Sequence, residues 1–120
     1  MVRHALIIIA LVALGRIGFP APDQKGDVRA GAILHKQHCL RCHGEKGRGD
    51  GPASRLLTPK PHDWSDKEYM AKFSDDDLYK MIAKGGPAVG KSKLMTAFEG
   101  KLKEADIRNL IAFIRAQAAK

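Results

Sequence analysis

The sequence contains few of the features that mark several common protein classes. Aromatic residues make up 6% of its 120 residues, whereas glycine occurs 12 times. This balance suits a compact fold with tight turns better than a large β-sheet. The formal net charge is +8, but lysine and arginine are scattered and form no run, and no aromatic residues interleave with them. These features argue against a nucleic-acid-binding protein and favour a partner with an acidic docking surface.

The sequence also has no apolar run long enough to cross a membrane. One short apolar run, residues 5–14, follows Arg3 and His4. It spans about ten residues, whereas a membrane-spanning helix needs roughly 17–25. A short basic region followed by such a run is typical of a secretory signal peptide. We therefore predict a signal peptide over residues 1–21 with an unfixed cleavage site, a single domain over residues 22–120, and export to the periplasm. The alternative is an uncleaved membrane anchor.

The pattern of residues 22–120 predicts helices separated by irregular segments. A first helix begins near Asp27 and runs toward His38, and a second begins at Ser74 with a capping-box-like Asp77 and ends at Gly85. The last helix covers about residues 103–118, where Ile107, Leu110, Ile111 and Ile114 form one apolar stripe. Residues 44–65 are rich in glycine and proline, and no strand alternation is visible. A long loop in a small domain indicates a function, such as wrapping a cofactor.

The two cysteines of the chain both fall in one short motif. The segment Cys39-Leu40-Arg41-Cys42-His43 has the spacing of c-type haem attachment. Two thiols three residues apart can each form a thioether to one haem vinyl group, and His43 then lies under the iron as an axial ligand. A disulfide, a thioredoxin-like pair and a zinc site are the alternatives. A zinc site would need a second pair of ligands at suitable spacing. A thioredoxin-like pair would need a βαβ pattern around the motif, and none is present. A disulfide is possible in an oxidising compartment, but the export signal together with the adjacent His43 favours haem.

The second axial position is open to several residues. A methionine thioether would raise the reduction potential of the haem. Met95 is favoured because it lies in an irregular segment that can bend round to the far haem face, whereas Met81 reads as a filler of the core and Met70 fits either role. The competing histidines are His35, His38 and His62.

The sequence resembles the class I c-type cytochromes, and in particular the small bacterial branch that includes the haem domains of cbb-type oxidase third subunits. The resemblance covers about residues 26–118. It rests on residues 39–44 running into Gly47–Ala53, on residues 85–98 with Met95, and on residues 104–114. It implies an all-α cytochrome c fold of about three to five helices wrapped round one covalent haem.

The same resemblance implies roles for individual residues. Met95 would be the sixth ligand, the Pro52 carbonyl would accept a hydrogen bond from His43, and Gly31 would be the small residue where the first and last helices cross. The sequence departs from the family where Thr96 replaces the usual proline after the axial methionine. It departs again in the first helix, where the family often has an aromatic residue. Leu34 is expected there, giving an aliphatic contact with Phe113.

The predicted function is that of a periplasmic, monohaem electron carrier between redox protein partners, and not of an enzyme. One alternative is a haem enzyme or ligand sensor with a labile sixth ligand, but the Met95 segment shows no acid–base constellation. Another alternative is a fixed electron-transfer subunit of a larger complex. The mature chain is expected to be soluble, with a membrane anchor only if the signal is uncleaved. Lys36, Arg41, Lys46, Arg48, Lys91 and Lys93 are expected to surround the haem edge as a docking surface.

Overall fold

The computed structural model describes residues 25–120. The predicted signal peptide, residues 1–21, lies outside the described residues. Within the described part the chain is helical and contains no strand; the one isolated β-bridge joins Glu99 and Leu102. The α-helices are α1 (Val28–His38), α2 (Leu40–His43), α3 (Lys67–Met70), α4 (Asp75–Lys84) and α5 (Glu104–Ala118), and two 3₁₀ turns, Ser54–Leu56 and Gly86–Val89, join them. The all-α prediction is confirmed.

The helix ends follow from the predicted capping residues. The Asp27 side chain caps α1 by accepting hydrogen bonds from the backbone N–H groups of Arg29 and Ala30. Ser74 and Asp77 form a reciprocal capping box at the start of α4, and the helix ends at Gly85. Gly85 has φ +82°, in the left-handed region that glycine adopts without strain. Local sequence therefore determines where α1 and α4 begin.

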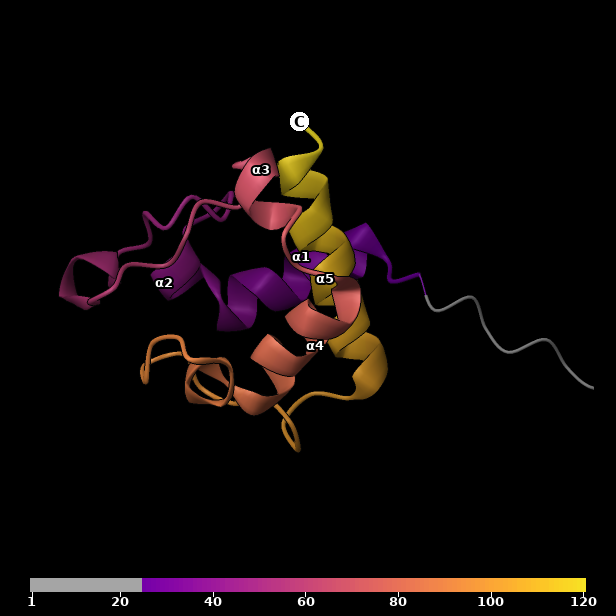
Figure 1. The fold of residues 1–120 in the computed structure, drawn as a ribbon. Helices are drawn as coiled ribbons and strands as arrows, with labels where there is room; N and C mark the ends of the chain where they lie inside the picture. The colour runs from indigo at the N-terminus through magenta and orange to yellow at the C-terminus, as the bar shows by residue number, and fades with distance from the viewer. Residues whose placement is uncertain (1–24) are drawn as a thin grey trace, which may run out of the picture.

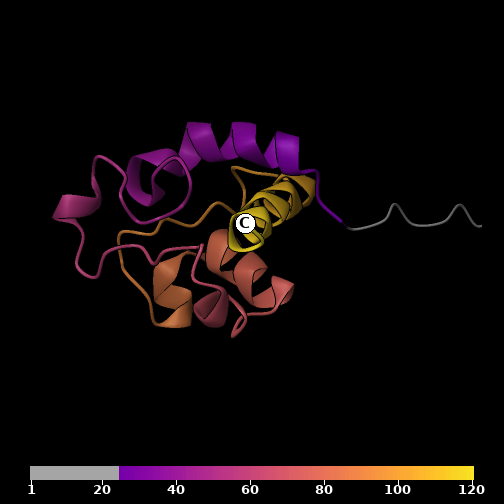
Figure 2. The same ribbon diagram turned by 90° about the horizontal axis from the view of Figure 1, so that it is seen from above.

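Helix α5 lies between α1 and α4 and provides the centre of the core. Figure 1 shows α1 crossing α5, and Figure 2 shows α5 almost end-on with α1 on one side and α4 on the other. The predicted apolar stripe is buried, and Ile107 and Leu110 are each only 1% exposed. Gly31 lies at the crossing, where an added Cβ would come within 2.0 Å of the Asn109 carbonyl oxygen and 2.9 Å of the Phe113 Cβ. The prediction for Gly31 is confirmed.

The aromatic contact at this crossing differs from the expectation. The ring that stacks on Phe113 belongs to His35, with centroids 4.8 Å apart and planes at 30°. The prediction of an aliphatic contact through Leu34 was therefore wrong, although Leu34 does pack against the core. Both residues lie near the Gly31 face of the helix, three and four positions on, but His35 is the buried one that meets Phe113, whereas Leu34 is only partly buried.

The short α3 is held against α5 by one arginine. Arg115 donates to the backbone carbonyls of Met70, at 3.0 Å, and Phe73, and it pairs with Asp75 at 2.8 Å. These bonds fix the turn between α3 and α4.

The irregular segments 44–65 and 85–98 lie on the same side of the helices in both ribbon views (Figures 1 and 2). Backbone hydrogen bonds link them to the helices, such as Ala53 N–H to the Arg41 carbonyl of α2 at 2.9 Å and Phe98 N–H to the Ile82 carbonyl of α4 at 3.0 Å. None of the helices in residues 25–120 combines the length and the apolar character that crossing a membrane requires.

Candidate functional site

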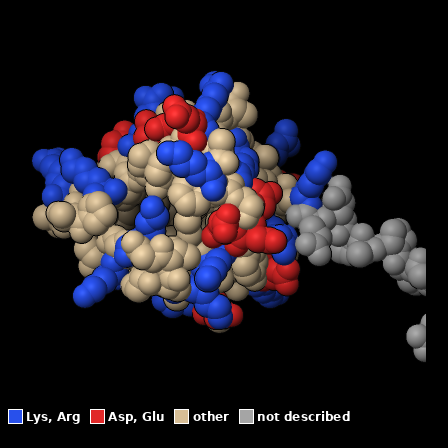
Figure 3. Space-filling view, in the orientation of Figure 1, with Lys and Arg blue, Asp and Glu red and all other residues tan. Residues whose placement is uncertain are grey.

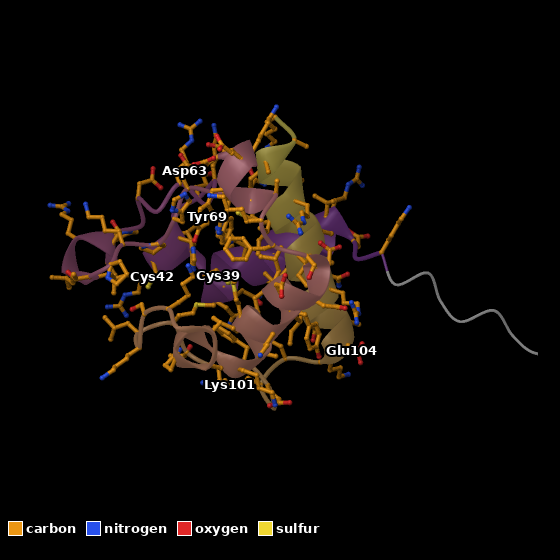
Figure 4. All side chains as sticks on the ribbon, in the orientation of Figure 1. Cys39, Cys42, Asp63, Tyr69, Lys101 and Glu104 are labelled. Atoms are coloured by element: carbon orange, nitrogen blue, oxygen red, sulfur yellow. The ribbon has the colours of Figure 1, made fainter. Side chains whose placement is uncertain are left out.

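The cysteine motif lies at the junction between α1 and α2. Cys39 ends the first helix and precedes the second, and its carbonyl accepts hydrogen bonds from the N–H groups of Cys42 (3.1 Å) and His43 (2.9 Å). This helical turn places two residues three positions apart on one face. Both thiols are free, half-buried and line the same cavity, together with His43. Figure 4 shows the two cysteines near each other on this wall, with Tyr69 close by.

The cavity has a volume of about 420 Å³, within the range of small-molecule and cofactor sites. Figure 3 shows a recess in the viewed face, with lysine and arginine side chains crowding the left-hand side of that face. The lining is mainly apolar and aromatic, and none of the described residues that form it is an aspartate or glutamate. One wall comes from α1, α2 and the loop before α3, and a second wall comes from α4 and residues 86–98.

The burial of the thiols makes a redox-active pair unfavourable. Burial and, to a smaller extent, the neighbouring Cys42 raise the pKa of the Cys39 thiol to about 11. A reactive dithiol of the thioredoxin type needs a lowered thiol pKa, because the thiolate is the nucleophile. The environment of Cys39 therefore disfavours the thioredoxin-like alternative.

His43 presents a neutral imidazole to the site. Burial and, to a smaller extent, the proximity of His35 lower its pKa to about 4, so the ring carries no charge at neutral pH. The ring stacks on the buried Trp64 with centroids 4.7 Å apart. Its Nδ1 atom is buried and has no hydrogen-bond partner among the described residues. A neutral imidazole has a lone pair available for a metal ion.

The structure does not contain the expected hydrogen bond between His43 and Pro52. Pro52 is exposed and does not line the cavity, and the His43 ring packs on Trp64 instead. The neighbouring Gly51 packs closely under α2, where an added Cβ would come within 2.6 Å of the Leu40 carbonyl oxygen. The role of Pro52 remains a prediction from the resemblance.

Met95 lines the same cavity as the cysteine motif. It is half-buried, its N–H bonds to the Ser92 carbonyl at 3.2 Å, and its carbonyl accepts from Gly86 at 2.9 Å. Met70 and Met81 line the same cavity, so Met81 is more than a core filler. The choice of Met95 as ligand therefore remains a prediction.

The structure separates the three histidines that could compete as ligands. His38 and His62 line the cavity, whereas His35 does not. His62 stacks on Tyr69 and pairs with Asp66 at 3.4 Å. His35 is only 2% exposed. Its buried position was not predicted from the sequence, where it was considered only as a competing ligand. The available signal was its position four residues after Gly31 and four before Cys39 on one helix face. Within residues 25–120 no three His, Cys, Asp or Glu side chains are grouped to hold a bare metal ion.

Comparisons with known proteins agree with this geometry. Residues 26–114 match the family model described as cytochrome c oxidase, cbb3-type, subunit III. Cytochrome c6 of Picosynechococcus sp. is 30% identical over 114 residues, which cover 94% of this chain and 93% of that protein.

Two solved structures share the fold. A chain of the Kuenenia stuttgartiensis reducing HAO-like protein complex has a TM-score of 0.64 and 25% identity, and the match covers 78% of this chain but only 43% of that one. The KustC0563 c-type cytochrome has a TM-score of 0.60 and 29% identity, over 72% of this chain and 95% of that one.

Proposed function

This chain belongs to the cbb3-type subunit III family of class I c-type cytochromes, and on that premise we propose that it is a periplasmic carrier of single electrons with one haem. Membership of the family implies haem c and electron transfer. The observation that supports a carrier most directly is the shared cavity. Cys39, Cys42 and His43 line one wall, and Met95 lines the other.

The residues of the cavity fit a haem group. The walls are mainly apolar, two free thiols lie three residues apart, and a neutral imidazole stands beside them. In this proposal Cys39 and Cys42 would hold the group covalently, and His43 and Met95 would bind its iron. When bound, such a group would supply one-electron chemistry. Because the chain has only two cysteines, it would attach one haem.

The lining residues favour electron transfer over catalysis. An enzyme or sensor needs an open coordination position, and usually acid–base groups placed near it. Here Met95 and His43 line the same cavity, and the part of the cavity that the structure describes has no carboxylate in its lining. Apolar walls also keep water away from the group. An enzyme alternative would have to use lining residues such as His38, His62 and Tyr69. Binding of carbon monoxide to the reduced protein would support that alternative.

The mass of the purified protein tests the proposed attachment. We expect the native protein to exceed the mass of its processed polypeptide by one haem, and acid–acetone to leave that haem attached. Cys39→Ala/Cys42→Ala should release it, whereas Lys80→Ala, at an exposed position of α4, should not. A bare polypeptide mass, or an extractable haem in the native protein, would refute covalent attachment.

The proposed partners are redox proteins with acidic docking surfaces. All six basic residues named for the docking surface are exposed, and Lys91 also lines the cavity. Rim charges mainly set the association rate, and screening weakens them as the Debye length falls from about 30 Å at 0.01 M salt to about 10 Å at 0.1 M. The electron-transfer rate with an acidic partner should therefore fall over this range.

Charge reversal separates docking from simple solvation of the surface. Lys91→Glu/Lys93→Glu should flatten the salt dependence, and Lys120→Glu should not. Equal effects from the two variants would mean that the basic charge is not a docking device. Affinity isolation from the periplasm distinguishes a free carrier from a fixed subunit, because only a subunit should co-purify in a fixed ratio.

A further inference from the structure

One buried polar side chain has no role in the site as described above. His35 lies on α1 behind the cysteine wall, is 2% exposed and does not line the cavity. Its Nε2 atom lies 2.7 Å from the carbonyl oxygen of Gly44, the residue that directly follows His43. A buried polar group is costly unless it is hydrogen-bonded, so the presence of a histidine here calls for an explanation.

The hydrogen bond defines the tautomer of His35. Burial lowers the pKa of this imidazole, so the ring is neutral at pH 7. A carbonyl oxygen can only accept, and Nε2 must therefore carry the proton and donate. The Nδ1 atom then has the lone pair, and it has no partner among the described residues. The ring is thus a directed donor to the Gly44 carbonyl.

This carbonyl belongs to the backbone that determines where His43 lies. Gly44 ends α2 with φ +82°, and its carbonyl also accepts from Gly47 N–H at 3.1 Å. The His43 carbonyl accepts from Gly49 N–H at 2.9 Å. The bonds from Gly47 and Gly49 come from the loop itself. The bond from His35 is a side-chain bond that joins this backbone to the long helix α1.

The His35 ring also supports the packing around His43. It stacks on Phe113, and it meets Trp64 edge-on with centroids 5.3 Å apart. Trp64 in turn stacks on the His43 ring. Trp64 has little freedom to shift, because it packs so closely on Gly47 that a Cβ there would overlap its ring. The rings of His35, Trp64 and His43 therefore form a continuous packed row.

We propose that His35 is a positioning residue for His43, which it holds through the Gly44 carbonyl and through Trp64. The inference rests on the proposed function, in which His43 is an axial ligand. A phenylalanine at this position would provide the ring contacts but could not donate, whereas histidine provides both. A less firmly held imidazole stabilises the oxidised iron less, so loss of this bond should shift the redox equilibrium toward the reduced form.

Three substitutions separate the hydrogen bond from the packing. Glutamine places its amide nitrogen as many bonds from Cβ as the histidine Nε2, so His35→Gln keeps the donor. His35→Asn places its amide nitrogen at the Nδ1 position and is the matched control. His35→Phe keeps the ring and loses the donor. All three variants are examined as the haem-containing protein. The equilibrium constant for reduction is measured against a mediator of fixed potential, and the low-spin signal of the oxidised form is measured by electron paramagnetic resonance.

We expect His35→Phe and His35→Asn to change the equilibrium constant for reduction by up to about tenfold, the range spanned by one net hydrogen bond. Their low-spin signals should also broaden, and His35→Gln should resemble the wild type in both measurements. If His35→Phe is indistinguishable from the wild type, the residue only fills space and the proposal is wrong. If His35→Gln does not fold, the comparison of His35→Phe with the wild type still decides.

Failure of the proposed function would be visible separately. The wild-type protein would then lack a covalent haem or a low-spin signal, whatever the His35 variants do.

Discussion

The two walls of the cavity are built in different ways. The cysteine wall is fixed to the helical core, because α1 crosses α5 at Gly31 and His35 bonds to the Gly44 carbonyl. The Met95 wall is a loop held mainly near its ends, where Gly86 N–H bonds to the Met95 carbonyl and Phe98 N–H bonds to the Ile82 carbonyl. Between these ends Leu94 is 58% exposed and an added Cβ at Gly90 would meet nothing within 4 Å. The cysteine wall is thus part of the helical core. The loop that contains Met95 can change its conformation without disturbing that core.

The largest effect on stability is expected at the helix crossing. In Gly31→Val the new side chain would overlap the Asn109 carbonyl and Phe113, which forces α1 away from α5. Overpacking of this kind costs about 1–3 kcal/mol or more in the free energy of unfolding. Urea unfolding of the haem-containing protein measures it, with Gln37→Val as the matched control at an exposed position of the same helix. Equal losses in the two variants would show that the crossing is not a tight contact.

A smaller loss of stability but a clear loss of ligation is expected on the other wall. In Gly86→Ala the new Cβ would come within 2.0 Å of the Ser92 carbonyl oxygen and 3.0 Å of the Met95 Cβ, so the loop must move. The weak near-infrared absorption of methionine bound to oxidised iron should therefore decrease. Ala88→Ser, exposed in the same turn, is the control. If Gly86→Ala destabilises the protein as much as Gly31→Val, the two walls do not differ as described.

A modest dependence on pH should come from His35, the buried histidine of α1. Burial lowers the pKa of its imidazole, whereas an unfolded histidine titrates near 6.5. Below about pH 6.5 the unfolded chain therefore binds more protons at this position than the folded chain. This contribution to stability is fully present above that pH and decreases as the pH falls below it.

Variants at the two histidines of α1 test this assignment. His35→Gln cannot be protonated, so its urea midpoint should fall less between pH 7 and pH 4.5 than that of the wild type. His38→Gln, at an exposed position, should follow the wild type. An unchanged pH dependence in His35→Gln would assign the acid sensitivity to other groups.

The sequence predicted the parts of the fold that depend on local chemistry. Asp27, Ser74 with Asp77, and Gly85 identified helix ends because capping needs only neighbouring atoms. The stripe that includes Ile107 and Leu110 identified the buried face of α5. The role of His35 was missed because it depends on contacts with Gly44 and Trp64, which come close to His35 only when the chain is folded. The short helix α3 was missed because Arg115, 45 residues from Met70, helps to fix the turn that follows it.

The most direct test of the central claim, a haem held between His43 and Met95, is the near-infrared spectrum of the oxidised protein and of three methionine variants. Met70, Met81 and Met95 all line the cavity, so each could in principle bind the iron and each variant serves as a control for the others. The account predicts that the methionine–iron absorption is present in the wild type, survives in Met81→Ala and Met70→Ala, and disappears in Met95→Ala. Loss of the absorption in Met70→Ala with retention in Met95→Ala, or its absence from the wild type, would contradict the account.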